Sequence, residues 1–265
     1  MTATTRPLDG AIALVTGAAS GIGHAIAHRF AADGATVIAA DIDDTGLARL
    51  HEQIGAAVHP VHCDVTSEAE VEAACAVAAG LGGLDIAVAN AGRGAFAPVV
   101  DHPLDEWRAI MDLCVTGVFL TVKHSALVMR DGGSVITIAS LNGTQPSAGM
   151  SAYCTAKAGV MMFTKVAAME LGSRGIRVNA IAPGLVQTNA TGAFWMVPGV
   201  VEEFVDNTTL GRFAQPADIA AAAAYLGGPD SSFVSGTVLA VDGGASTKRY
   251  PDLPAAFARM AAPTE

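Results

Sequence analysis

Short apolar runs alternate with longer segments of mixed polarity along most of the chain. The runs are almost continuously apolar, which is typical of strands that are buried on both faces of a sheet. The pattern predicts seven strands, at residues 11–16, 36–40, 57–62, 86–89, 134–139, 176–181 and 238–241.

The longer segments repeat apolar residues with the 3.6-residue period of a helix that buries one face. The longest covers residues 104–129, where Trp107, Ile110 and Cys114 fall on one stripe. Strands that alternate with helices predict a parallel sheet with helices on both faces and right-handed crossovers. We therefore expect an α/β fold, a single doubly wound domain over residues 1–265, with a nucleotide site at the carboxyl ends of the strands. The other predicted helices are at residues 22–33, 45–54, 67–79, 153–171 and 216–225.

Two segments depart from this alternation. Residues 184–213 form a long irregular insertion rich in glycine, threonine and asparagine, and such a segment inside a compact domain is usually a lid. Simple packing or a subunit contact is the alternative for its apolar residues. Residues 245–265 extend beyond the last predicted strand. This extension either crosses a subunit interface or is a loosely ordered end, and the sequence leaves both open.

Composition excludes several classes of protein. The chain is 51% hydrophobic and 15% charged, too apolar for disorder, yet no uninterrupted apolar run reaches the ~18 residues of a membrane span. Residues 1–10 carry Arg6 and Asp9 without the apolar centre of a secretion signal. A net charge of −10 disfavours nucleic acid and anionic membranes as partners. Four cysteines without CxxC spacing indicate neither a disulfide framework nor a thiolate zinc site. We expect a soluble, cytoplasmic protein with a small-molecule substrate.

A glycine-rich run, TGAASGIG at residues 16–23, directly follows the first predicted strand and opens the first predicted helix. Glycines permit a tight turn and close approach of the backbone, and the helix N-terminus offers unpaired N–H groups to a pyrophosphate. The run lacks the GK[ST] ending of a P-loop, which argues against an NTPase. We predict a dinucleotide site with contacts from Gly17, Ser20, Gly21, Ile22 and Gly23.

Asp41 ends the second predicted strand, 18 residues beyond Gly23. A carboxylate there can accept hydrogen bonds from the adenosine ribose hydroxyls, and it would repel a 2′-phosphate by roughly 1–4 kcal/mol. The next residues, Ile42, Asp43 and Asp44, supply no cation to offset that repulsion. The sequence therefore predicts NAD(H) over NADP(H) as the cofactor. A role for Asp41 as a helix cap is the alternative.

Tyr153 and Lys157 lie four residues apart at the start of a predicted helix and therefore share one face. A phenol has a pKa of about 10, and an ammonium ~4 Å away would stabilise its phenolate by up to ~4 kcal/mol. Ser140 follows the fifth predicted strand, where its hydroxyl could polarise a carbonyl group. A YxxxK pair taken alone is common by chance.

Together these residues resemble the short-chain dehydrogenase/reductase family over almost the whole chain. The resemblance implies a seven-stranded Rossmann fold, commonly assembled as a homotetramer. The matching segments, in family order and spacing, are residues 16–23, Asp64-Val65, Asn90-Ala91-Gly92, Ser140, Tyr153 with Lys157, Pro183-Gly184 and Val241-Asp242-Gly243-Gly244.

The resemblance implies a role for each catalytic residue. Tyr153 would be the acid/base, Ser140 would bind the substrate oxygen, and Lys157 would bind the nicotinamide ribose and lower the tyrosine pKa. For the cofactor, Asp64 and Val65 would hold the adenine. The remaining implied cofactor contacts are Asn90, Ala91, Gly92, Tyr153, Lys157, Pro183, Gly184, Val186 and Thr188.

Cys114 departs from the family pattern. In the family, a helical asparagine in an Asn-x-x-Gly segment is the fourth catalytic member and holds a water in the proton relay to the lysine. Here the segment is Cys114-Val115-Thr116-Gly117. Cys114 lies on the apolar stripe of its predicted helix, so it is either a small buried hydrophobe or a reactive thiol near the nicotinamide. In both cases the proton relay needs another route.

The histidines do not predict a metal site. His24 and His28 are an i, i+4 pair, and His59 and His62 flank Pro60, but neither pair has a third ligand at convincing spacing.

We expect reversible hydride transfer between NAD(H) and a secondary alcohol or ketone. Mostly apolar expected walls favour a medium-sized apolar or alicyclic alcohol, and Asn142 and Gln145 leave room for a second polar group. A polyol, sugar or dihydrodiol dehydrogenase stays open, as does a catalytically weak NAD-binding protein because of Cys114. Asp41 disfavours an acyl-carrier-linked ketoreductase. The expected walls are Phe96, Leu141, Asn142, Gln145, Gly149, Leu185, Phe194, Trp195 and Met196.

Overall fold

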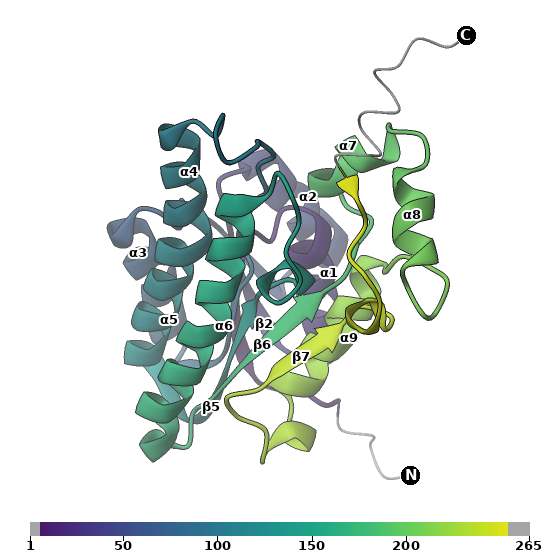
Figure 1. Ribbon diagram of the computed structural model, residues 1–265. Coiled ribbons are helices and arrows are strands. Elements are labelled where there is room, and N and C mark those ends of the chain that lie inside the picture. The colour runs from purple at the N-terminus through teal and green to yellow at the C-terminus, as the bar shows by residue number, and fades with distance from the viewer. Residues whose placement is uncertain (1–5, 254–265) are drawn as a thin grey trace, which may run out of the picture.

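A parallel sheet of seven strands forms the centre of the molecule (Figure 1). The computed structural model describes residues 6–253, and within them the strands lie in the order β3-β2-β1-β4-β5-β6-β7. The chain reverses its direction of travel across the sheet between β1 and β4, which creates a crevice at the carboxyl ends of these strands. The strands are β1 (Ile12–Thr16), β2 (Thr36–Asp41), β3 (Val58–His62), β4 (Leu84–Ala89), β5 (Met129–Ile138), β6 (Arg177–Pro183) and β7 (Val238–Val241).

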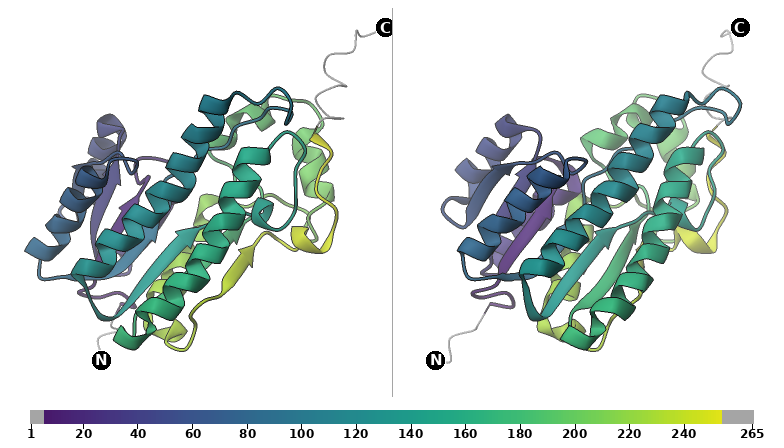
Figure 2. Two further views of the ribbon diagram at one scale, coloured as in Figure 1. Left: turned by 60° about the vertical axis from the view of Figure 1, so that its left-hand side comes forward. Right: turned by 90° about the vertical axis from the view of Figure 1, so that its left-hand side faces the viewer.

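Helices cover both faces of the sheet (Figure 2). One layer consists of α1 (Gly21–Ala32), α2 (Asp44–Ile54) and α9 (Pro216–Gly227). The other consists of α3 (Glu68–Gly80), α5 (Gly117–Val128) and α6 (Ser151–Leu171), with α4 (Leu104–Met111) leading into α5. The predicted doubly wound α/β fold is therefore confirmed.

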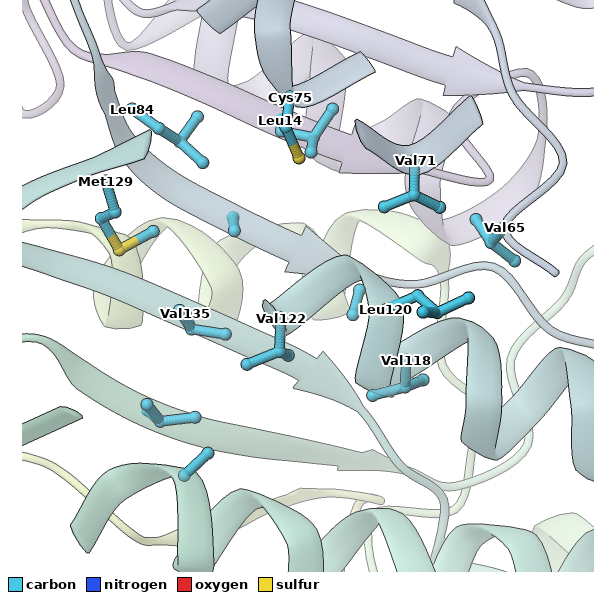
Figure 3. Close-up of a cluster of buried hydrophobic side chains, with 14 of the residues drawn as sticks. Leu14, Val65, Val71, Cys75, Leu84, Val118, Leu120, Val122, Met129 and Val135 are labelled. Carbon is cyan, nitrogen blue, oxygen red and sulfur yellow. The ribbon is translucent and has the colours of Figure 1, made fainter. Parts of the chain in front are cut away.

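The strands are apolar throughout because their two faces pack into two separate clusters. In β1, Leu14 packs with Val71 and Val122 on one face (Figure 3), and its neighbour Val15 packs with Phe30 on the other. Successive side chains of a strand point to opposite faces, so a strand between two helical layers needs apolar residues at every position.

The helix predicted over residues 104–129 is not continuous. A π-helical turn, Asp112–Thr116, separates α4 from α5. The apolar stripe passes through the turn, because a change from i→i+4 to i→i+5 hydrogen bonds inserts one residue without making the sequence polar. The prediction also began the fifth strand too late, since Met129 already pairs with Leu84 before a register shift in β4.

The insertion at residues 184–213 is more regular than predicted. It contains the short helices α7 (Gly192–Trp195) and α8 (Val200–Asp206). Val200 and Phe204 of α8 are buried, so the insertion packs onto the domain through an apolar face of its own. From residue 245 to 253 the chain then runs back along this insertion (Figure 1). Residues 254–265 lie outside the described part of the chain.

One helical stretch of the described chain, Leu104–Val128, is long and apolar enough to cross a membrane by length and composition. Its mean hydropathy is high enough for a membrane span, although it contains no long uninterrupted apolar run. In the fold, 56% of its most apolar window is buried. It packs as a core helix against the sheet and α3.

Truncation of a core side chain should destabilise the protein strongly. Leu84 is 0% exposed and Leu104 is 59% exposed, so they form a matched pair. We expect Leu84→Ala to lower the free energy of unfolding by about 2–5 kcal/mol because it leaves a cavity, and Leu104→Ala by less than ~1 kcal/mol. Urea unfolding followed by circular dichroism measures both, and equal losses would contradict the packing described here.

Candidate active site

A cavity of about 590 Å³ lies at the carboxyl ends of the strands. It extends from the glycine-rich turn after β1, past the ends of β2, β3 and β4, to Ser140 after β5 and the segment after β6. Residues distant in the sequence meet there because parallel strands end at the same edge. Among the predicted residues, its lining contains Gly17, Ser20, Gly21, Ile22, Asp41, Asp64, Val65, Asn90, Ala91, Gly92, Ser140, Tyr153, Lys157, Pro183, Gly184, Val186 and Thr188.

The glycine-rich turn is held by Asn90. Its side-chain Nδ2 donates hydrogen bonds to the carbonyl oxygens of Thr16, at 2.9 Å, and Gly17, at 3.1 Å. Gly17 has a φ of +66°, and a Cβ there would lie 2.8 Å from this amide nitrogen. Gly23 is outside the cavity lining, and a Cβ on it would overlap the Gly17 carbonyl. Its function is thus to let α1 approach the turn.

The start of α1 has the properties of an anion site. Ser20 is the N-cap but makes no side-chain capping bond, and the first turn of α1 has no acidic residue. The first N–H groups of the helix therefore face the cavity without a side-chain acceptor. Together with the closely packed glycines, this arrangement fits the pyrophosphate of a dinucleotide.

Asp41 is fixed at the edge of this turn. Its Oδ2 accepts a hydrogen bond from the Ala19 N–H at 2.9 Å, and its Oδ1 accepts one from the Asp43 N–H at 3.0 Å. The N-cap of α2 is Asp43, which accepts from the Gly46 N–H. Asp41 is therefore not the side-chain cap of that helix, and its carboxylate lines the cavity.

Ser140, Tyr153 and Lys157 converge at the other end of the cavity. Tyr153 and Lys157 are one turn apart on α6, and the lysine Nζ lies 5.6 Å from the centroid of the tyrosine ring. Lys157 is buried, and its Nζ donates a 2.7 Å hydrogen bond to the Ile138 carbonyl. The Ser140 Oγ accepts from the Asn142 N–H at 3.1 Å, and Ser140 is close enough to Tyr153 to influence its pKa. The serine and tyrosine hydroxyls can therefore bind one substrate oxygen.

The pKa shifts of this cluster reflect its burial. Burial raises the pKa of Tyr153 to about 12, and the hydrogen bond with Ser140 opposes that rise. Burial likewise lowers the pKa of Lys157. The resemblance to the family predicts a lowered tyrosine pKa, but in this structure the pKa of Tyr153 is raised. The reason is that loss of solvation penalises the phenolate, while the ammonium is bonded to Ile138.

Cys114 lies behind the cavity wall rather than in it. Its side chain is fully buried in the π-helical turn, and its Sγ donates a 3.4 Å hydrogen bond to the Arg93 carbonyl. A Cβ on Gly92 would lie 3.3 Å from this sulfur and 3.5 Å from the Lys157 Nζ. The thiol therefore packs against the backbone that separates it from the cavity, as a small buried group does.

The substrate end of the cavity differs partly from the predicted walls. Phe96, Leu141, Asn142, Leu185 and Phe194 line it as predicted. Four predicted residues do not line it, and these are Gln145, Gly149, Trp195 and Met196.

The displaced residues have other contacts. Gln145 donates hydrogen bonds to backbone carbonyls of the C-terminal segment. Trp195 stacks edge-on against Phe213, with ring centroids 4.7 Å apart. Met196 is 77% exposed, and Gly149 lies behind the ring of Phe96. The sequence thus predicts the correct segment for the lid. The direction of each side chain in it depends on the short helices α7 and α8, which the sequence does not predict.

Sequence reasoning also missed several lining residues. Met150, Phe204 and Tyr250 contribute to the apolar wall at the substrate end, and Leu113 contributes from the π-helical turn. Phe204 follows an apolar spacing with Val200 and could have been found as part of an amphipathic helix. Nothing in the local sequence places Tyr250 near the cavity.

Within residues 6–253, no three His, Cys, Asp or Glu side chains are grouped to hold a metal ion. His24 and His28 instead share the Gln53 Oε1, each at 3.0 Å. His62 pairs with Asp44 at 2.9 Å.

Comparisons with known proteins agree with this architecture. A family model described as enoyl-(acyl carrier protein) reductase matches residues 17–246. The chain is 39% identical over 247 residues to galactitol 2-dehydrogenase (L-tagatose-forming) of Cereibacter sphaeroides, covering 91% of this chain and 97% of the relative. It is 38% identical over 240 residues to a 3-alpha-(or 20-beta)-hydroxysteroid dehydrogenase of Mycobacterium tuberculosis, covering 89% and 90%. A short-chain type dehydrogenase/reductase from Mycobacterium ulcerans has a TM-score of 0.90 at 33% identity, over 94% of each chain.

The fold and these comparisons together indicate an oxidoreductase of the dehydrogenase/reductase class. The chain belongs to the short-chain dehydrogenase/reductase family. Dehydrogenases of this family use NAD or NADP, and the relatives act on small-molecule alcohols. The named relatives differ in substrate, so the family alone does not define the alcohol.

Proposed function

We propose that this protein is an NAD(H)-dependent dehydrogenase that interconverts a secondary alcohol and a ketone. The observation that carries the proposal is the convergence of Ser140, Tyr153 and Lys157 in the same cavity as the glycine-rich turn. A dinucleotide that binds the turn through its pyrophosphate can extend to this cluster along one continuous wall. Bound there, nicotinamide supplies the hydride acceptor or donor of the reaction.

Each side chain of the cluster has a distinct role in the proposal. The hydroxyls of Ser140 and Tyr153 hold the substrate oxygen, and Tyr153 takes the alcohol proton as the carbonyl forms, or returns it in the reverse direction. Lys157 contacts the nicotinamide ribose and favours the phenolate through its charge. Because burial opposes that effect, the free protein keeps Tyr153 protonated at neutral pH.

The proposed preference for NAD(H) rests on Asp41. Two backbone N–H groups fix its carboxylate at the cavity edge, where it can accept bonds from the ribose hydroxyls and repel a 2′-phosphate. Asp64 is similarly fixed, because its Oδ1 accepts from the Thr66 N–H at 2.9 Å. It would hold the adenine together with Val65.

The proposed substrate is a medium-sized apolar or alicyclic alcohol. Phe96, Met150, Phe194 and Phe204 make the substrate end of the cavity mainly apolar, and apolar walls bind such a skeleton by excluding water. A polyol is the second candidate, because a 39% identical relative is a galactitol 2-dehydrogenase. A test panel therefore needs both kinds of alcohol.

Replacement of the proposed acid/base should abolish turnover but leave cofactor binding. We expect Tyr153→Phe to lower kcat for NAD⁺ reduction by about 10²–10⁴-fold, with little change in the Kd for NAD⁺. Absorbance of NADH with cyclohexanol, galactitol and a hydroxysteroid measures the rate, and calorimetry measures the Kd. Because the pKa of Tyr153 is raised to about 12 and oxidation needs the phenolate, the wild-type rate should rise from pH 7 to pH 10.

Tyr225→Phe is the matched control, since Tyr225 lies on α9 outside the cavity lining. It should retain the wild-type rate. Tight NAD⁺ binding without turnover of any alcohol would instead favour a catalytically weak NAD-binding protein. An equal rate in Tyr153→Phe and wild type would exclude the proposed role of the tyrosine.

Removal of the Asp41 charge should relax the choice of cofactor. We expect Asp41→Ser to lower the ratio of kcat/KM with NAD⁺ to that with NADP⁺ by about five-fold to a thousand-fold, because the repulsion is roughly 1–4 kcal/mol. Asp105→Ser removes the same charge from an exposed site on α4 and should leave the ratio unchanged. A wild-type enzyme that uses both cofactors equally would refute the proposal.

We also propose a homotetramer that uses the outer face of α5 and α6 as one of its interfaces. Met162, Val166 and Met169 form an exposed stripe on α6, with Met169 85% exposed, and Phe119 and Leu127 are exposed on α5. The two helices lie side by side (Figure 1). An exposed apolar surface of this kind is typical of contacts between subunits, and the same face on a second copy can cover it in an isologous pair.

A charge in this face should break the assembly. We expect Val166→Glu to lower the molar mass in light scattering from that of the wild-type oligomer, because the interface would bury an unpaired carboxylate. Val100→Glu is the control, since Val100 is an exposed valine before α4. A monomeric wild type, or an unchanged mass in Val166→Glu, would contradict this interface.

A further inference from the structure

The segment at residues 245–253 closes the substrate end of the cavity. After β7 it turns back and runs beside the lid helices α7 and α8, as the yellow ribbon of Figure 1 and the views of Figure 2 show. One of its side chains, Tyr250, lines the cavity together with Phe194 and Phe204. The proposed function assigns no role to this segment.

The segment is anchored to the floor of the cavity. The Gln145 Nε2 donates hydrogen bonds to the carbonyl oxygens of Ser246, at 3.1 Å, and Lys248, at 2.8 Å. The Tyr250 hydroxyl donates a 3.0 Å hydrogen bond to the Asn142 Oδ1. Asn142 and Gln145 both belong to the loop that follows Ser140. The position of the segment is therefore tied to the loop that carries the catalytic serine.

It is equally anchored to the lid. Arg249 pairs with Glu203 of α8 at 2.6 Å, and the Lys248 Nζ donates a 2.8 Å bond to the Asp206 carbonyl. Leu253 is fully buried in a cluster that contains Val200. Contacts on both sides hold the segment between floor and lid, so its side chains have fixed positions relative to the cavity.

Tyr250 is the residue of this segment that lines the cavity. Its ring stands edge-on to Phe204, with centroids 5.7 Å apart, and its hydroxyl is bonded to Asn142, whose backbone N–H in turn bonds the Ser140 Oγ. Two hydrogen bonds of Asn142 thus link the Tyr250 hydroxyl to Ser140, the residue that would hold the substrate oxygen. The ring and Ser140 therefore line the same cavity and are linked through one residue.

We propose that Tyr250 is a specificity-determining residue whose ring limits the size of the alcohol at the substrate end of the cavity. The inference rests on the proposed function, because it concerns the alcohol that Ser140 and Tyr153 would bind. The Tyr250 ring is held by packing against Phe204 and by a hydrogen bond. A larger substituent on the alcohol would therefore overpack the site and force side chains from their positions, which destabilises the complex. The proposed limit predicts that single-ring alcohols are better substrates than fused-ring alcohols.

Two secondary alcohols of different size test this role. The measurement is the ratio of kcat/KM for 2-decalol, which has two fused rings, to that for cyclohexanol, which has one. One methylene group in an apolar pocket changes such ratios by about 10–200-fold, so Tyr250→Ala should raise the ratio by about tenfold or more. Tyr250→Leu also shortens the side chain while keeping an apolar contact with Phe204, and it serves if the alanine variant fails to fold.

Matched variants separate size from general damage. Tyr250→Phe keeps the ring and should retain the wild-type ratio. Tyr225→Ala makes the same truncation as Tyr250→Ala, but on α9 outside the cavity lining, and it should also retain the wild-type ratio. An unchanged ratio in active Tyr250→Ala and Tyr250→Leu would overturn this inference and leave the proposed function intact. A lack of Tyr153-dependent oxidation of both alcohols in the wild type would overturn the proposed alicyclic substrate and this inference with it.

Discussion

The amide side chain of Asn90 joins the two strands between which the sheet reverses its order. Its Nδ2 bonds the carbonyls of Thr16 and Gly17, and its backbone N–H bonds the Thr16 hydroxyl. These bonds fix the end of β4 to the glycine-rich turn after β1. The cavity has its shape because this turn cannot move toward or away from β4. The start of α1, the carboxylate of Asp41 and the loop after Asn90 all take their positions from it.

Burial sets the pKa shifts in the cluster of Ser140, Tyr153 and Lys157. Lys157 could stabilise a phenolate, but it is itself desolvated and bonded to the Ile138 carbonyl. The pKa of Tyr153 therefore rises to about 12, although the YxxxK spacing favours a lower value. A positive charge 5.6 Å from the centroid of the tyrosine ring counts for less than the loss of water around the phenol. Cys114, whose thiol faces the Arg93 carbonyl behind the cavity wall, adds to the rise in the Tyr153 pKa and opposes the fall in the Lys157 pKa, in each case by less than burial does.

The substrate end of the cavity is built by three separate segments. The loop after Ser140 forms the floor, α7 and α8 form the lid, and residues 245–253 connect the two. All three segments lie at the end of the cavity away from the glycine-rich turn (Figure 1). This separation is consistent with relatives as different as a galactitol dehydrogenase and a hydroxysteroid dehydrogenase.

Local sequence is enough to predict the layer architecture, most of the strands, the glycine-rich turn and the placement of Ser140, Tyr153 and Lys157 near one another. These features follow from local periodicity and from residues at the ends of parallel strands, which must meet at one edge. Tertiary packing is responsible for the π-helical turn at Cys114, the side-chain directions in the lid and the upward shift of the Tyr153 pKa. It also placed Tyr250 against Asn142, 108 residues away. Hydrophobic periodicity encodes which face of a segment is buried, but it carries no information on which distant side chain will cover that face.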